Sequence, residues 1–146
     1  MPFIFFIVIG VIVSVVVAQI TKRNKEIITH LESGGEIRLK DNSANYFGRD
    51  SLKKNQPRGN GVLAIFNETL YFELYVPRKS IEIPLSMITG LERGTSFLGK
   101  TKMTPLLIVH FLNEFGQDET AAWQVKNLPA WEKTLNQTLS KGRRSL

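Results

Sequence analysis

The sequence predicts a mainly β protein, in which a small antiparallel barrel of six or seven strands is capped by a C-terminal α-helix and preceded by one transmembrane helix. Three observations support this prediction. An uncharged apolar run opens the chain, short strand-like segments separated by turn formers fill its middle, and an apolar stripe of helical period closes it. A chain of 146 residues has room for one domain and one appendage.

The opening run, from Phe3 to Ile20, predicts a transmembrane helix over residues 1–20. It contains no charged residue, and 14 of its 18 residues are Ile, Val or Phe. As a helix it would extend about 27 Å, close to the ~30 Å of a hydrocarbon core. Its β-branched residues would favour a strand in water, but in lipid only a helix satisfies its own backbone groups.

The basic residues that follow this run predict its orientation. Lys22, Arg23 and Lys25 come directly after it, and no charged side chain precedes it. The positive-inside rule then places the N-terminus outside and the rest of the chain in the cytoplasm, as a single-pass protein of the cell membrane. The alternative is a cleaved signal peptide, with Val16-Val17-Ala18 as the cleavage site, although the basic region that normally begins such a peptide is missing.

The remainder divides into a juxtamembrane linker at residues 21–35, a domain at 36–140 and a basic tail at 141–146. The linker is expected to hold at most a helical turn around Ile27, Ile28 and Leu31. The strands are expected at residues 36–40, around Tyr46 and Phe47, and at 61–66, 70–76, 80–85, 106–111 and 120–125. A three-residue hairpin loop, Asn67 to Thr69, joins two of them, and Pro84 indicates an edge strand or a strand end.

The last part of the domain changes to a helical period. Its apolar positions are spaced by three, four and four residues: Leu128, Trp131, Leu135 and Leu139. Asn127 is a suitable N-cap, Pro129 falls in the first turn, and Gly142 is expected to end the helix. Trp131 would then close an open end of the barrel.

This order of segments resembles the pleckstrin-homology-like (PH-like) superfold. The stretch that carries the resemblance is GNGVLAIFNETLYFELYVPRKSIEIPLSMITGLE, followed by GK, PLLIVHF, a glycine turn, AAWQV and PAWEKTL. In these residues the chain looks most like GRAM-type and bacterial PH-like domains, among them proteins with an N-terminal transmembrane anchor. The similarity covers roughly residues 36–140 and consists mainly of apolar positions. It implies a fold and a binding role more firmly than it implies a ligand.

The charges suggest what the domain contacts. Nineteen Lys and Arg against thirteen Asp and Glu give a net charge of +6, which favours anionic partners. In PH-like domains the first inter-strand loops often hold anionic headgroups, and the matching region here is a mobile basic loop. The candidate headgroup-binding residues are Lys53, Lys54, Arg58 and Arg49. No K-x(n)-R-x-R arrangement is present, so the resemblance does not extend to a specific inositol phosphate site. An ordinary solvated basic loop is the alternative.

Other chemistry finds little support in the sequence. GTSFLGKT, residues 94–101, matches the phosphate-binding P-loop pattern, but Pro105 and the strand after it leave no room for the helix that a P-loop requires, so a β–β loop is expected. No catalytic motif, metal-ligand spacing or cofactor pattern is present, and the chain has no cysteine. Nucleic acid is not an expected partner, because the aromatic residues fall in strands that need them for the core. We therefore expect a non-catalytic module that contacts lipids or, alternatively, binds a partner peptide at a sheet edge or beside the C-terminal helix.

Overall fold

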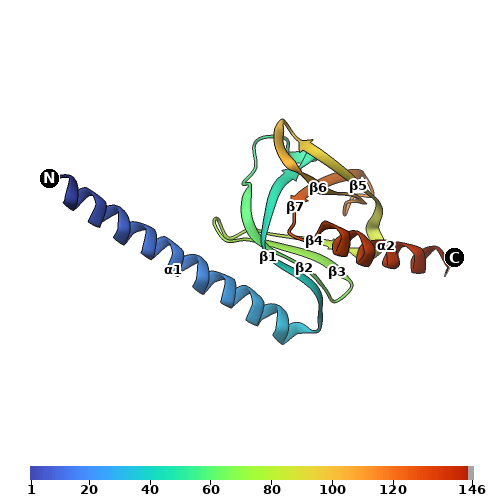
Figure 1. Ribbon diagram of the computed structural model, residues 1–146. Helices are drawn as coiled ribbons and strands as arrows, with labels where there is room; N and C mark the ends of the chain where they lie inside the picture. The colour runs from blue at the N-terminus through green and yellow to red at the C-terminus, as the bar shows by residue number, and fades with distance from the viewer. Residues whose placement is uncertain (145–146) are drawn as a thin grey trace.

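The computed structural model describes residues 1–144, except for the side chain of Lys102. It consists of α1 (Pro2–Gly34), β1 (Ile37–Arg49), β2 (Gly59–Phe66), β3 (Thr69–Leu74), β4 (Ser80–Pro84), β5 (Ile88–Phe97), β6 (Lys100–Leu112), β7 (Asp118–Gln124) and α2 (Leu128–Arg144). Two short 3₁₀ turns, Asp50–Leu52 and Leu85–Met87, follow β1 and β4. The predicted class, mainly β with a helix at each end, is confirmed (Figure 1).

All seven strands form one antiparallel sheet in the order β4-β3-β2-β1-β7-β6-β5. β1 connects the two halves, because its first part pairs with β2 and its last residues pair with β7. Register shifts in β1 accompany this change of partner. The sheet curves around its core as an open barrel whose edges are β4 and β5, so the prediction of an edge position for the strand that ends at Pro84 is confirmed.

Two local predictions are corrected. The strands expected at 36–40 and around Tyr46 are one continuous strand, β1, of 13 residues. A buried carboxylate holds its irregular part: Asp41 accepts hydrogen bonds from the backbone N–H of Ser43 at 2.8 Å and of Lys126 at 2.7 Å. The hairpin expected to have a three-residue loop has a two-residue turn, in which Asn67 and Glu68 adopt φ angles of 48° and 55°, the left-handed values of a type I′ turn.

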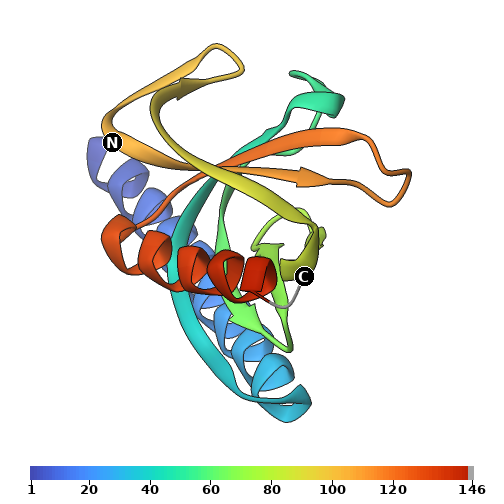
Figure 2. The same ribbon diagram turned by 90° about the vertical axis from the view of Figure 1, so that its right-hand side faces the viewer.

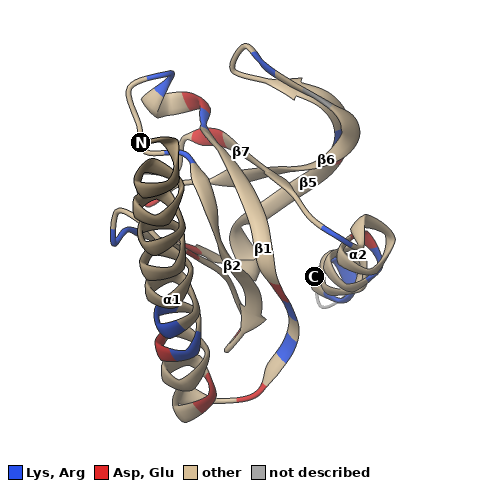
Figure 3. Ribbon diagram, turned by 60° about the vertical axis from the view of Figure 1, so that its left-hand side comes forward, with Lys and Arg blue, Asp and Glu red and all other residues tan. Residues whose placement is uncertain are grey.

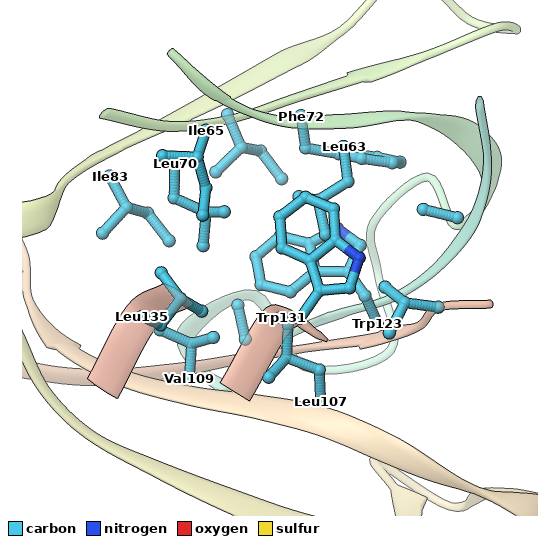
Figure 4. Close-up of a cluster of buried hydrophobic side chains, with 14 of the residues drawn as sticks. Leu63, Ile65, Leu70, Phe72, Ile83, Leu107, Val109, Trp123, Trp131 and Leu135 are labelled. Atoms are coloured by element: carbon cyan, nitrogen blue, oxygen red, sulfur yellow. The ribbon is translucent and has the colours of Figure 1, made fainter. Parts of the chain in front are cut away.

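The main core fills the concave side of the sheet (Figure 4). Tyr46, Phe72 and Trp123 form its aromatic centre, with ring centroids 5.2 to 5.9 Å apart. Trp131 and Leu135 of α2 enter the same cluster and are each 1% exposed. The prediction that Trp131 closes the barrel is therefore confirmed.

α2 begins and ends by different means. The Asn127 side chain accepts a hydrogen bond from the backbone N–H of Ala130 at 3.3 Å, as expected of an N-cap. The prediction that the helix ends at Gly142 is wrong, because the helix continues to Arg144. The first residues of the predicted basic tail are thus helical, and residues 145 and 146 of that tail lie outside the described residues.

α1 is longer than predicted, because the expected linker at residues 21–35 is its continuation as far as Gly34. Ile27 and Leu31, only 2% and 1% exposed, pack on the convex face of the sheet against Val62, Ala64, Tyr71 and Tyr75. β2 is therefore covered on both faces, by α1 outside and by the main core inside, which explains its continuous apolar run. Figure 2 shows α2 in front of β1 and α1 behind it.

The N-terminal half of α1 projects beyond the domain (Figure 1). By length and composition α1 is capable of crossing a membrane, and none of its apolar window is buried. Two of its hydroxyl groups bond within the helix: the Ser14 hydroxyl donates to the Gly10 carbonyl at 2.7 Å, and the Thr21 hydroxyl donates to the Val17 carbonyl at 2.9 Å. These bonds lower the cost of placing the segment in lipid.

Candidate functional site

The β1–β2 loop, residues 50–58, carries three of the four cations that the sequence singles out. Gln56 ties this loop to β1: its amide N–H group donates to the Arg49 carbonyl at 2.7 Å, and its amide oxygen accepts from the Arg49 backbone N–H at 2.8 Å. The same amide oxygen accepts a hydrogen bond from the Tyr46 hydroxyl at 3.2 Å. The loop expected to be mobile therefore has a fixed attachment next to its cations.

The three loop cations differ in their surroundings. Lys53 and Lys54 are exposed, and neither forms an ion pair with any of residues 1–144. Arg58 is half-buried, and one of its terminal N–H groups lies 3.4 Å from the Lys53 carbonyl oxygen. Its Nε–H is buried without a partner in the described part of the chain. Arg58 therefore supports the loop, while the two lysines are available to an external anion.

Arg49, the fourth candidate, is placed differently. Its guanidinium group forms a two-point ion pair with Glu119 of β7, with Nε 2.7 Å from Oε1, and lies 5.5 Å from the centre of the Phe111 ring. Glu119 is 2% exposed and also accepts a hydrogen bond from the Ser51 hydroxyl. The charge of Arg49 is thus compensated inside the domain, and Arg49 is not grouped with Lys53 and Lys54.

The P-loop match lies beside this loop and is a β-hairpin. β5 ends at Phe97, β6 begins at Lys100, and Leu98 and Gly99 form the turn with φ angles of 49° and 76°. No helix follows, so the expectation of a β–β loop is confirmed. The Lys100 amine lies 4.6 Å from the centre of the Phe47 ring, a cation–π contact.

The hairpin adds to the basic loop a residue that the sequence did not assign to it. A Cβ atom at Gly99 would lie 3.2 Å from the Lys54 amine, so the hairpin tip and the loop are in contact. We call Lys53, Lys54, Arg58 and Lys100 the basic end of the domain. Lys100 is recognised as a member only from the contact between these two loops, which are distant in sequence. The sequence did indicate that Lys100 lies at a glycine-containing turn.

A further titratable cluster lies away from the basic end. On the outer face of the sheet, His110 of β6 contacts Thr120 of β7 at 3.1 Å and Glu92 of β5 at 3.0 Å, which links three neighbouring strands. Within residues 1–144, no group of three His, Asp or Glu side chains is placed to hold a metal ion.

Because of Glu119, the domain is expected to lose stability at acidic pH. Burial on its own raises the pKa of this carboxyl group, but hydrogen bonds from Arg49 and Ser51 and the Arg49 charge outweigh it and hold the pKa below its usual value. A folded-state pKa below the unfolded one gives stability that is present above the unfolded pKa, about 4.5, and is lost as the pH falls through the folded pKa. We expect the urea midpoint to fall below about pH 4.5 in the wild type and to fall less steeply in Glu119→Gln. Equal slopes in the two proteins would contradict this assignment.

In comparisons with known proteins, no family model matches the sequence, and a search of curated proteins finds no match.

Proposed function

We propose that the chain is a single-pass protein of the cell membrane whose PH-like, GRAM-type domain acts on the cytoplasmic face as a non-catalytic binding module. In this proposal the basic end contacts anionic lipid headgroups of the membrane that α1 spans. The observation that carries the proposal is that the basic end lies at the end of the domain toward which the apolar half of α1 extends. The strand order and the capping helix are compatible with a PH-like fold, and the sequence resemblance gives the finer assignment.

The docking of α1 supports this direction. Ile27 and Leu31 hold the domain beside the C-terminal half of the helix, so the sheet cannot turn freely about it. The β1–β2 loop and the β5–β6 hairpin lie at the end of the domain toward the N-terminal half of α1, whereas the β2–β3 turn lies at the opposite end (Figures 1 and 3). A bilayer around the apolar half of α1 would face the basic end.

The expected energies are sufficient for a tethered domain. Each Lys or Arg near an anionic surface contributes about 1 kcal/mol, so Lys53 and Lys54 together contribute about 2 kcal/mol. A domain with this attraction alone would bind vesicles weakly from solution. On a membrane-spanning helix it is already at a high effective concentration, so a weak contact is well populated.

A spin label in the β1–β2 loop tests the proposal. The chain contains no cysteine, so Asn55→Cys gives a single labelling site beside the two lysines. We expect the full chain in anionic nanodiscs to show a less mobile and less water-accessible label than in neutral nanodiscs, because the loop rests on the headgroups. Adding Lys53→Glu and Lys54→Glu should remove the difference, and raising the salt concentration should reduce it.

The matched control reverses two exposed charges on another face, Lys126 and Lys133, and should leave the label unchanged. Equal spectra in neutral and anionic discs would contradict lipid contact by the basic end. The intact mass of the purified protein tests the anchor separately, because loss of residues 1–18 would indicate a cleaved signal peptide.

A groove beside α2 favours a second candidate, the binding of a partner peptide. The groove has a volume of about 1230 Å³ and lies between the last turns of α2 and the β4–β5 corner. Leu85, Ile88 and Leu139 give it an apolar floor, and Arg38 and Lys141 give it a basic rim. This candidate predicts that Leu139→Glu abolishes capture of an acidic peptide, while charge reversal at Lys53 and Lys54 does not. Capture that survives Leu139→Glu would contradict it.

A further inference from the structure

A second surface feature lies where α1 passes the β3–β4 loop, residues 75–79. The two segments enclose an open crevice of about 630 Å³, well separated in sequence from the basic end. Its lining includes Val16, Ile20, Lys22, Arg23, Val76 and Arg78. Figure 3 shows the loop beside α1.

Apolar and cationic side chains both line the crevice, together with the acidic residue Glu26. Val16 and Ile20 belong to the uncharged run of α1, and Val76, which lines the crevice with them, is 76% exposed. Lys22 and Arg78 also line the crevice and are exposed. Apolar and cationic groups therefore meet along one short stretch of α1.

The length of this stretch matches the edge of a bilayer. From Val16 to Arg23 the helix rises about 10 Å. A headgroup region is about 5 to 7 Å thick on each side of the hydrocarbon core. If α1 spans the membrane with its uncharged run in the core, the crevice extends from the outer part of the acyl chains into the headgroups.

The charges of the crevice are incompletely compensated. Arg23 is paired with Glu73, with Nη2 2.5 Å from Oε2, while its Nε–H is buried without a partner among residues 1–144. Arg78 lies 3.5 Å from Glu26, and because both side chains are largely exposed this contact is weak. Lys22 forms no ion pair within the described residues. One positive charge therefore remains after pairing, which equals the charge of one phosphodiester group.

We propose that the crevice seats one anionic phospholipid of the membrane that α1 spans. Its phosphate is held by Lys22 and Arg78, and the start of an acyl chain lies against Val16, Ile20 and Val76. This inference rests on the proposed membrane anchor but not on headgroup contact by the basic end. The bound lipid would join the β3–β4 loop to α1 and so hold the domain at a fixed angle to the helix.

Native mass spectrometry of the full chain released from detergent micelles tests this site. With one equivalent of phosphatidylglycerol added, we expect the wild type to retain one lipid. Lys22→Gln/Arg78→Gln should bind it about thirty-fold more weakly, because two charged contacts are lost. The control variant Lys25→Gln/Lys133→Gln removes the same charge, including one juxtamembrane lysine that does not line the crevice, and should bind like the wild type.

Two results would overturn the proposal. One is equal retention of phosphatidylglycerol by the wild type and by Lys22→Gln/Arg78→Gln. The other is equal retention of diacylglycerol, which has the same chains without the phosphate. If the hypothesis of a retained membrane anchor is wrong, the same spectra show a mass lacking residues 1–18. If the hypothesis of headgroup contact by the basic end is wrong, the spin label in the β1–β2 loop shows it.

Discussion

Replacing Arg49 by Met should destabilise the domain by about 3 kcal/mol, because it leaves the Glu119 carboxylate buried without its cation. Removing one partner of a buried ion pair typically costs 3–5 kcal/mol, and the lower value applies here because the Arg49 side chain keeps 28% of its exposure. Urea denaturation of the full chain in detergent measures the loss as a lower midpoint at unchanged slope. If Arg49 were chiefly a headgroup ligand, the midpoint would stay where it is.

A second Arg–Glu pair provides the matched control. Arg93 of β5 forms a two-point ion pair with Glu132 of α2, but its side chain is 53% exposed. Solvent screens such a pair, so Arg93→Met should lower the urea midpoint far less than Arg49→Met does. In Arg49→Met/Glu119→Leu, where no buried charge remains, much of the lost stability should return. Equal losses of stability in Arg49→Met and Arg93→Met would show that the burial of Glu119 does not affect the stability of the domain.

The sequence predicts well those elements whose signal is local. Alternation in 80–85, the apolar run at 106–111 and the spacing of Leu128, Trp131 and Leu135 each report a single strand or helix. The Asn127 cap is local in the same sense, since it acts three residues away. Such features follow from propensity and period without knowledge of the neighbours in space.

The hairpin turn at Asn67 and the end of α2 are local errors, whereas the other predictions that needed correction concern contacts between distant segments. Arg49 and Glu119 are 70 residues apart, and an isolated arginine in a basic stretch gives no sign of its partner. Lys100 joins the basic end only because the β5–β6 hairpin folds over Phe47. The continuation of α1 through residues 21–34 depends on a convex sheet surface that the chain builds later. The unbroken apolar run of β2 partly indicated that a helix covers this surface, because a strand covered on only one face would not need such a run.

That packing leads to the second large effect. Leu31→Ala should release the C-terminal half of α1 from the sheet, because Leu31 is 1% exposed among Val62, Ala64 and Tyr71. A buried Leu→Ala change costs about 3–5 kcal/mol, which corresponds to roughly a hundred-fold or greater increase in amide hydrogen exchange over residues 24–34. His30→Ala, on the exposed side of the same turn, should leave the exchange rates nearly unchanged.

The same variant separates attachment from orientation. In Leu31→Ala the uncharged run of α1 is intact, so under the proposed membrane anchoring the variant should insert into nanodiscs to the same extent as the wild type. The domain would no longer be held at one angle, and the basic end would face the bilayer for only part of the time. We therefore expect the label at position 55 to become more mobile in anionic discs, although Lys53 and Lys54 are unchanged. A label that stays immobile would mean that the lipid contact alone orients the domain, and that the packing of α1 on β2 and β3 serves stability only.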